Sequence, residues 1–127
     1  MKKAHLFAAI ITIVIFLISG LYMRIYFPEA YHNDQVMRAA FRTTHIYILF
    51  NSLCHLLLGT YLVTNQTKKR YILRLISSAF IMLASLFLII SFFYQAGHGE
   101  DSLRRFGVII TAIGVVGQAL ATVKENP

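Results

Sequence analysis

Four long apolar stretches, separated by short polar segments, dominate the chain. They cover approximately residues 5–27, 37–64, 71–95 and 102–123. A helix needs about 20 apolar residues to cross the hydrocarbon core of a bilayer, and each stretch is long enough. Because the links between them are short, consecutive helices should run antiparallel. The pattern predicts an all-α integral membrane protein, an antiparallel bundle of four transmembrane helices with short loops, as a single domain over residues 1–127.

The composition agrees with a bundle surrounded by lipid. Hydrophobic residues make up 57% of the chain and charged residues only 13%, whereas a soluble domain carries about 25% charged residues. The net charge is +7, but the basic residues form short clusters between the apolar stretches. We interpret these clusters as anchors to anionic head groups and expect no nucleic acid partner. The expected partners are the lipid bilayer, and other membrane subunits or further copies of the chain.

The first apolar stretch also resembles a secretory signal, because Lys2 and Lys3 precede it. Its apolar part is longer than the ~7–15 residues of a signal-peptide core, and no A-x-A-like cleavage site follows it. We therefore expect this stretch to remain as a transmembrane helix. Pro28 and the polar residues after it predict a loop over residues 27–35.

The basic residues also predict how the bundle lies in the cell membrane. With four spans, both termini and the central link share one side. That side would carry Lys2, Lys3, Lys68, Lys69, Arg70, Arg74 and Lys124, and the opposite side Arg24, Arg38, Arg42, Arg104 and Arg105. Since cytoplasmic segments carry the excess of Lys and Arg, we expect both termini in the cytoplasm.

The second stretch concentrates the polar groups of the predicted membrane core. At 100° per residue they share one arc of the helix, with Asn51 just beside it. The stripe consists of Arg38, Arg42, His45, Asn51, Ser52 and His55, with the small residue Gly59 in line. Because polar groups in hydrocarbon usually face a bundle interior or a cavity, we expect this stripe to face the other three helices. It is either a ligand site or a set of interhelical hydrogen bonds.

Haem b is one ligand that this stripe could hold. His45 lies near the predicted outer interface and could ligate the iron, while Arg38 and Arg42 on its outward side could pair with the propionates. A second axial ligand would have to come from another helix. The outer candidates, His32 and His98, both fall in predicted loops.

The deeper histidine of the stripe, His55, has no evident partner in the sequence. His5 lies at the inner edge of the first stretch, too shallow to reach His55 easily. His45 is about 15 Å from His55 along the helix, too far for direct proton transfer. A quinone or a transported ligand is an alternative to haem. However, the membrane stretches contain no Asp or Glu, which argues against antiport through a membrane carboxylate.

A weaker candidate site lies in the predicted outer loops. His32, His98, Glu100 and Asp101 offer imidazole and carboxylate groups, which suit divalent metals. Their spacing matches no compact metal motif, and two separate loops would have to converge. The alternative is that these are solvated loop residues, with the acids paired to nearby arginines.

The fourth stretch carries a seam of small residues. Gly107, Thr111, Gly114, Gln118 and Ala121 recur at alternating spacings of four and three. Such a seam is typical of close helix–helix contact, and we expect it to close the bundle internally. Gln118, its strongly polar member, should hydrogen-bond across the contact.

The sequence offers little support for an enzyme. Cys54 and His55 are adjacent, so on a helix they point about 100° apart and cannot form a catalytic dyad. The chain has no H-E-x-x-H, no C-x-x-C and no Gly-rich phosphate loop. We expect a non-enzymatic accessory or assembly subunit of a membrane complex. The alternatives are an electron-transfer subunit that binds haem b or quinone, and a small transporter or outer-face metal-binding protein.

Overall fold

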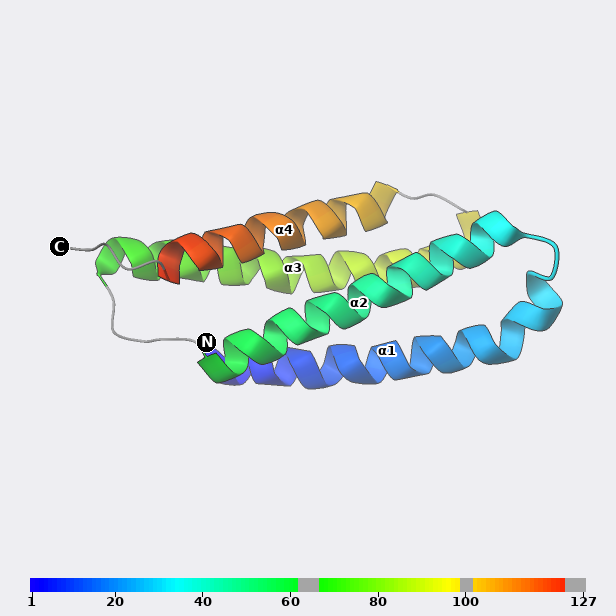
Figure 1. The fold of residues 1–127 in the computed structure, drawn as a ribbon, viewed down its shortest axis with the longest axis horizontal. Helices are drawn as coiled ribbons and strands as arrows, with labels where there is room; N and C mark the ends of the chain where they lie inside the picture. Colours follow the sequence, from blue (N-terminus) through cyan, green and yellow to red (C-terminus); the bar gives the residue numbers. More distant parts are fainter. Residues whose placement is uncertain (62–66, 99–101, 123–127) are drawn as a thin grey trace.

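The computed structural model consists of helices that run up and down in turn (Figure 1). It describes residues 1–61, 67–98 and 102–122, and the side chains of 95–98 lie outside the description. Four helices occupy this part of the chain: α1 (Lys2–Ala30), α2 (Gln35–Tyr61), α3 (Lys68–His98) and α4 (Ser102–Thr122). Consecutive helices are antiparallel, as predicted. The N-terminus lies at the end of the bundle where α2 and α4 finish and α3 begins (Figure 1).

Helix α1 extends further than the sequence predicted. It includes Pro28 and ends at Ala30, so the loop after it is shorter than the expected 27–35. The proline lacks the N–H that would have bonded to the carbonyl of Arg24, and its ring crowds that same carbonyl. The N–H of Tyr31 still donates to the carbonyl of Phe27 at 3.3 Å. The last turn therefore closes in spite of the proline.

Three of the helices in the described part of the chain are long and apolar enough to cross a membrane. They are α1, the part of α3 from Lys68 to Tyr94, and α4. Helix α2 is also long enough, with 27 residues. However, its mean hydropathy is lower than that of the other three helices, because it carries the polar stripe.

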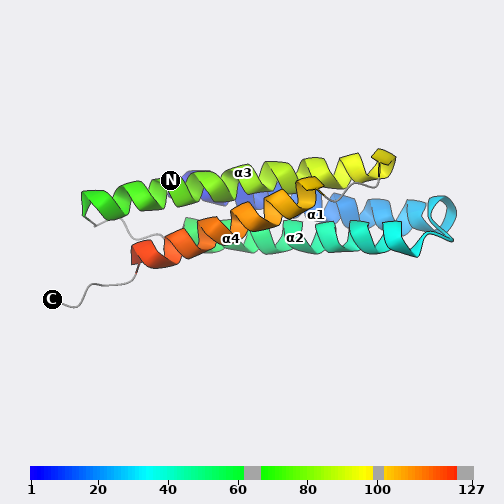
Figure 2. The same ribbon diagram turned by 90° about the horizontal axis from the view of Figure 1, so that it is seen from above.

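The helices pair into two hairpins, α1–α2 and α3–α4, which meet mainly along α2 and α3 (Figures 1 and 2). Within the described residues, α1 and α4 do not contact each other. The two central helices are therefore α2 and α3, with α1 and α4 on either side. This arrangement places the deeper part of the α2 stripe, with Asn51 and His55, against the second hairpin.

The contact between α3 and α4 depends on small residues of α4. A Cβ atom added at Gly114 would lie 2.5 Å from Ile81 Cγ1 and 3.0 Å from the carbonyl oxygen of Ser77. Gly117, one turn further along α4, also has no space for a side chain, because an added Cβ would collide with the hydroxyl of Ser77. The absence of side chains at these positions allows the two backbones to approach closely.

Gln118 hydrogen-bonds across the same contact. Its Nε2 donates to the carbonyl oxygen of Arg74 at 3.0 Å and to Ser78 Oγ at 2.8 Å. All five members of the predicted seam are buried: Gly107, Thr111, Gly114, Gln118 and Ala121. The prediction of an internal small-residue seam is therefore confirmed.

Aromatic side chains fill the half of the bundle that lies toward the α1–α2 loop. Phe27, Phe41 and Phe92 are buried and come from three different helices. The ring centroid of Phe41 lies 5.3 Å from that of Phe27 and 5.2 Å from that of Phe92, both in edge-to-face arrangement. Aromatic rings prefer this geometry because the positive edge of one faces the negative face of the other. We call this group the aromatic cluster.

Replacement of Gly114 by leucine should destabilise the bundle. The new side chain would push against Ile81 and the backbone at Ser77, and such overpacking costs about 1–3 kcal/mol or more. Thermal unfolding in detergent, followed by circular dichroism, measures the effect. The control is Ala112→Leu, two residues earlier on the exposed surface of α4, which should change stability by less than about 0.5 kcal/mol. Equal loss in both variants would contradict the close α3–α4 contact.

Candidate functional site

A continuous set of hydrogen-bonded side chains crosses the half of the bundle that contains the N-terminus. The Nδ1 atoms of His5 in α1 and His55 in α2 lie 2.8 Å apart. His55 Nε2 lies 2.7 Å from Ser85 Oγ in α3. Ser85 Oγ donates to Asn51 Oδ1 in α2 at 2.5 Å, and Asn51 Nδ2 donates to Thr111 Oγ1 in α4 at 3.3 Å. These five residues, the polar network, come from all four helices and join the two hairpins.

The polar network is excluded from solvent. His55 is fully buried, His5 and Asn51 are each 1% exposed, and Ser85 is 7% exposed. A buried polar group that loses its partner costs about 1–3 kcal/mol. In hydrocarbon, water is not present to replace that partner. Each member therefore depends on the position of the next one.

The tautomers of both histidines follow from counting which groups of the network have a proton to donate. Ser85 Oγ has one proton, which it donates to Asn51 Oδ1 or to the carbonyl oxygen of Ile81. Ser85 Oγ must therefore accept its bond from the Nε2–H of His55. A neutral His55 then has an unprotonated Nδ1, so the bond between the two imidazoles is donated by the Nδ1–H of His5.

The remaining bonds of the polar network follow the same direction. Thr111 Oγ1, which accepts from Asn51, donates to the carbonyl oxygen of Gly107 at 2.8 Å. The donors thus follow one another from His5 of α1 to Thr111 of α4, with one step, from Ser85 to Asn51, that returns from α3 to α2. A proton added to His55 at Nδ1 would place two N–H groups face to face, so the network requires His5 and His55 to be neutral. It acts as a connection between helices and does not hold a charge.

His5 and Ser85 are the members of the network that the sequence did not predict. The expectation that His5 lies too shallow to reach His55 was wrong. Helix α1 already begins at Lys2, and α2 runs antiparallel to it down to Tyr61. The two helices also approach closely here, because a Cβ added at Gly59 would lie 2.6 Å from Leu6 Cγ. The start of α1 therefore lies beside the last turns of α2.

His45 lies further toward the aromatic half and binds α1 alone. Its Nδ1 is 2.8 Å from Ser19 Oγ, and its ring stacks on Phe16 with the centroids 4.0 Å apart. Its Nε2 faces the backbone of α1, since a Cβ added at Gly20 would lie 3.5 Å from it. Neither nitrogen is thus directed at space for a porphyrin, and a haem on His45 would displace α1. The observed packing does not fit a haem at this position.

The other pair of histidines does not fit a haem either. Two imidazoles that share one iron need their nitrogens about 4 Å apart, since each metal–nitrogen bond is about 2 Å long. The Nδ1 atoms of His5 and His55 are 2.8 Å apart and hydrogen-bonded directly. The haem alternative therefore gains no support from the packing of the described residues.

The predicted polar stripe of α2 divides into two parts. Its deeper residues are buried as expected, namely Asn51, Ser52, His55 and Gly59. Ser52 donates to the carbonyl oxygen of Ile48 in its own helix at 2.7 Å and is not part of the network. Arg42 is exposed and Arg38 is half-buried, and both line an open hollow against the end of α1. The expectation that the whole stripe faces the bundle interior was therefore wrong for the arginines.

The proposed outer metal site falls largely outside the described residues. Glu100, Asp101 and the side chain of His98 are not described, and His32 is exposed. Within residues 1–61, 67–98 and 102–122, no group of three or more His, Cys, Asp or Glu side chains is arranged to hold a metal ion. The metal hypothesis stays a prediction.

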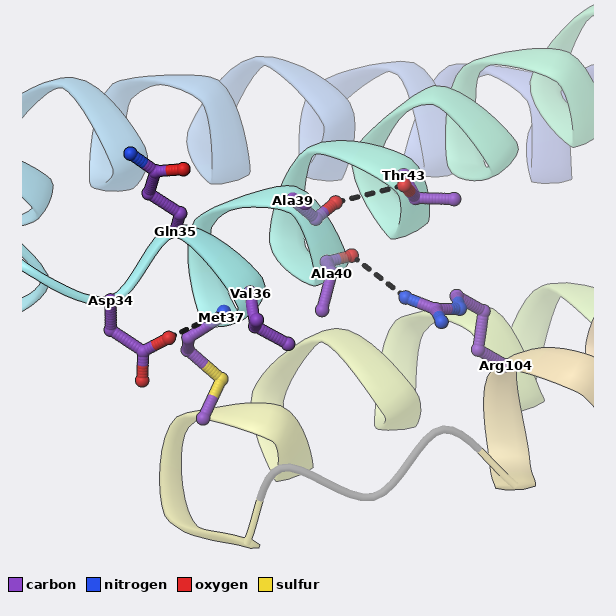
Figure 3. Close-up of a pocket in the computed structure, with 8 residues that line it drawn as sticks. All are labelled: Asp34, Gln35, Val36, Met37, Ala39, Ala40, Thr43 and Arg104. Carbon is purple, nitrogen blue, oxygen red and sulfur yellow. Dashed lines mark hydrogen bonds between the residues drawn. The ribbon is translucent and has the colours of Figure 1, made fainter.

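Two charged side chains that line a hollow at the start of α2 make hydrogen bonds to the backbone (Figure 3). The hollow measures about 560 Å³. Asp34 Oδ1 accepts the N–H of Met37 at 2.9 Å and caps the first turn of α2. Arg104 of α4 donates to the carbonyl oxygen of Ala40 in α2 at 3.1 Å. These two side chains serve a helix end and the contact between the hairpins.

An apolar groove lies on the surface between α2 and α4. It measures about 280 Å³ and is lined by residues such as Phe50, Val108 and Val115. Thr111 is part of the lining, and its hydroxyl already donates to Gly107 and accepts from Asn51.

Comparison with known proteins gives no match: no protein family, no curated protein and no solved structure corresponds to this chain.

Substitution of His55 by leucine should loosen the bundle. It leaves the Nδ1–H of His5 without an acceptor and the hydroxyl of Ser85 without a donor. We expect a loss of about 1–3 kcal/mol, measured by thermal unfolding in detergent. The control Thr60→Ala removes an exposed hydroxyl of the same helix, which bonds only to its own backbone at Leu56 and Leu57, and should be nearly neutral.

A double-mutant cycle with His5→Leu separates the imidazole pair from general packing. The two substitutions should be non-additive by about 0.6 kcal/mol and at most about 1.7 kcal/mol, as for interhelical hydrogen bonds in a membrane protein. Additive effects would mean that His5 and His55 do not interact.

Proposed function

We propose that this protein is a four-span membrane subunit without catalytic activity of its own, which supports the assembly of a larger membrane complex. The polar network is the observation that supports this role most directly. Its histidines, serine, asparagine and threonine are bonded to one another and to the backbone. Groups that could perform chemistry are thus used to hold the helices together.

The low hydropathy of α2 is compatible with a transmembrane position. At ~1.5 Å per residue its length is about 40 Å, more than the ~30 Å of a bilayer core. Asn51, Ser52 and His55 are buried against the other helices. The residues that α2 exposes along its middle are large and apolar, such as Phe50 and Leu57. Helices with polar groups directed inward span membranes in this way.

The same packing argues against a transporter. A transported ion or proton needs a polar path through both halves of the bundle. The polar network occupies one half, while the aromatic cluster of Phe27, Phe41 and Phe92 fills the other. The His45–Ser19 pair is separate from both, because its bonds are to α1 alone.

The exposed surface of α1 supports a role as a subunit. Only 17% of the most apolar segment of α1 is buried within the bundle, against 44% for α3. Large apolar side chains cover its outward side, including Phe7, Val14, Ile18 and Ile25. Helix α1 packs mainly against α2 and touches α3 only slightly, so most of its surface is available for another membrane protein.

Cysteine labelling tests the four-span arrangement. Cys54 is the only cysteine, so Cys54→Ala gives a background free of thiols. In this background, Lys3→Cys and Lys69→Cys should react with an impermeant reagent from the cytoplasmic side, and Asn33→Cys from the opposite side. Labelling of positions 33 and 69 from the same side would mean that α2 does not span the membrane.

Native electrophoresis after extraction in a mild detergent tests the subunit role. We expect the chain to migrate with a discrete membrane protein of defined stoichiometry. Val14→Trp combined with Ile18→Trp should weaken this association by about tenfold or more, since bulky groups disturb a packed interface. Ile113→Trp on the exposed surface of α4 is the control and should leave it intact. A chain that migrates alone as a stable monomer would rule out the proposal.

A further inference from the structure

Three arginines from two helices surround one hollow at the aromatic end of the bundle. Arg24 comes from α1, one turn before Pro28, and Arg38 and Arg42 come from successive turns of α2. The hollow measures about 310 Å³ and opens to the outside. Arg38 and Arg42 share a face of α2 because residues four apart are neighbours on a helix.

The guanidinium groups of these arginines are not engaged elsewhere in the described part of the chain. Arg38 Nε is buried without a hydrogen-bond partner there. Arg24 and Arg42 make neither a hydrogen bond nor an ion pair with any described residue. Their situation differs from that of Arg104, which donates to the backbone of α2.

Three unpaired positive charges on one hollow create a strong preference for an anion. The described lining contains no carboxylate that could neutralise them, since the other lining residues are Met23, Phe27 and Pro28. Each guanidinium is a planar fork of N–H donors that matches the oxygens of a phosphate or carboxylate. A phosphate group offers enough oxygens to engage several arginines at once, whereas a single carboxylate offers two.

We propose that Arg24, Arg38 and Arg42 form a binding site for a phosphate group. The apolar lining contributed by Phe27 and Pro28 would contact the carbon atoms attached to that phosphate. Such a group is supplied either by the head group of an anionic phospholipid or by a soluble phosphate compound. The site lies at a helix end beside the aromatic cluster, where a membrane interface would bring phospholipid head groups. A lipid can supply the phosphate only if the bundle lies in a membrane, whereas a soluble phosphate compound needs no membrane. Neither source requires the protein to be a subunit of a larger complex.

Native mass spectrometry of the whole chain in a non-ionic detergent tests the proposal. Phosphatidylglycerol and phosphatidylcholine are added separately, and inorganic pyrophosphate is added as a competitor. We expect retention of phosphatidylglycerol over phosphatidylcholine, with affinity that decreases as ionic strength rises. Displacement by pyrophosphate would identify a soluble phosphate compound as the natural source, and resistance to it a lipid head group. Either result supports a phosphate site.

Matched arginine variants locate the site. Arg38→Gln combined with Arg42→Gln should lower the affinity for phosphatidylglycerol by about tenfold or more, because each lost charged hydrogen bond is worth at least that factor. Arg105→Gln removes an exposed arginine of α4 and should have no effect. Arg38→Lys with Arg42→Lys keeps the charge and should bind phosphatidylglycerol with intermediate affinity. This variant tests the site even if the Gln variant is unstable. Equal retention of both lipids, or equal loss in Arg105→Gln, would overturn the proposal.

Discussion

His5 and His55 share one proton between their Nδ1 atoms, and the position of that proton constrains the rest of the bundle. Because His5 donates, His55 must use Nε2 to donate to Ser85, and the remaining bonds then follow in one direction to the backbone of α4. Helices α1 and α4 do not touch each other in the described residues. The polar network is thus a connection between the two outer helices that the apolar packing alone does not provide. Hydrogen bonds suit this task because they specify one register, whereas apolar side chains are as stable against lipid as against each other.

Much of the fold could be predicted from the pattern of apolar and polar residues. The number of helices and their antiparallel order follow from the stretch lengths and short links. The seam on α4 follows from the spacing of its glycines, because helical periodicity alone places Gly107 and Gly114 on one face. The predicted helix ends were less accurate. Pro28 suggested that α1 ends there, yet the proline lies near the end of the helix, where its missing N–H removes only one hydrogen bond.

The sequence predicted only the α2 residues of the polar network, and there is a physical reason for this limit. Periodicity shows which residues of α2 share a face, and it placed Asn51 and His55 with the interior. It does not show which residues of another helix lie opposite, because that depends on the register of the hairpin and the tilt of its helices. His5 and Ser85 were therefore missed as partners of His55, and Ser19 as the partner of His45. Arg42 was placed inside on angle alone, although a long charged side chain near a helix end readily reaches the surface.

The division of the network between the hairpins has a consequence for biosynthesis. The first hairpin contains His5 and His55 and can form their bond as soon as α1 and α2 have been synthesised and pack together. Asn51 cannot be satisfied then, because its partners Ser85 and Thr111 belong to helices synthesised later. Until the second hairpin packs against the first, the side-chain amide of Asn51 thus lacks both of these partners. The same amide that secures the finished bundle is therefore the group left unsatisfied in the unfinished one.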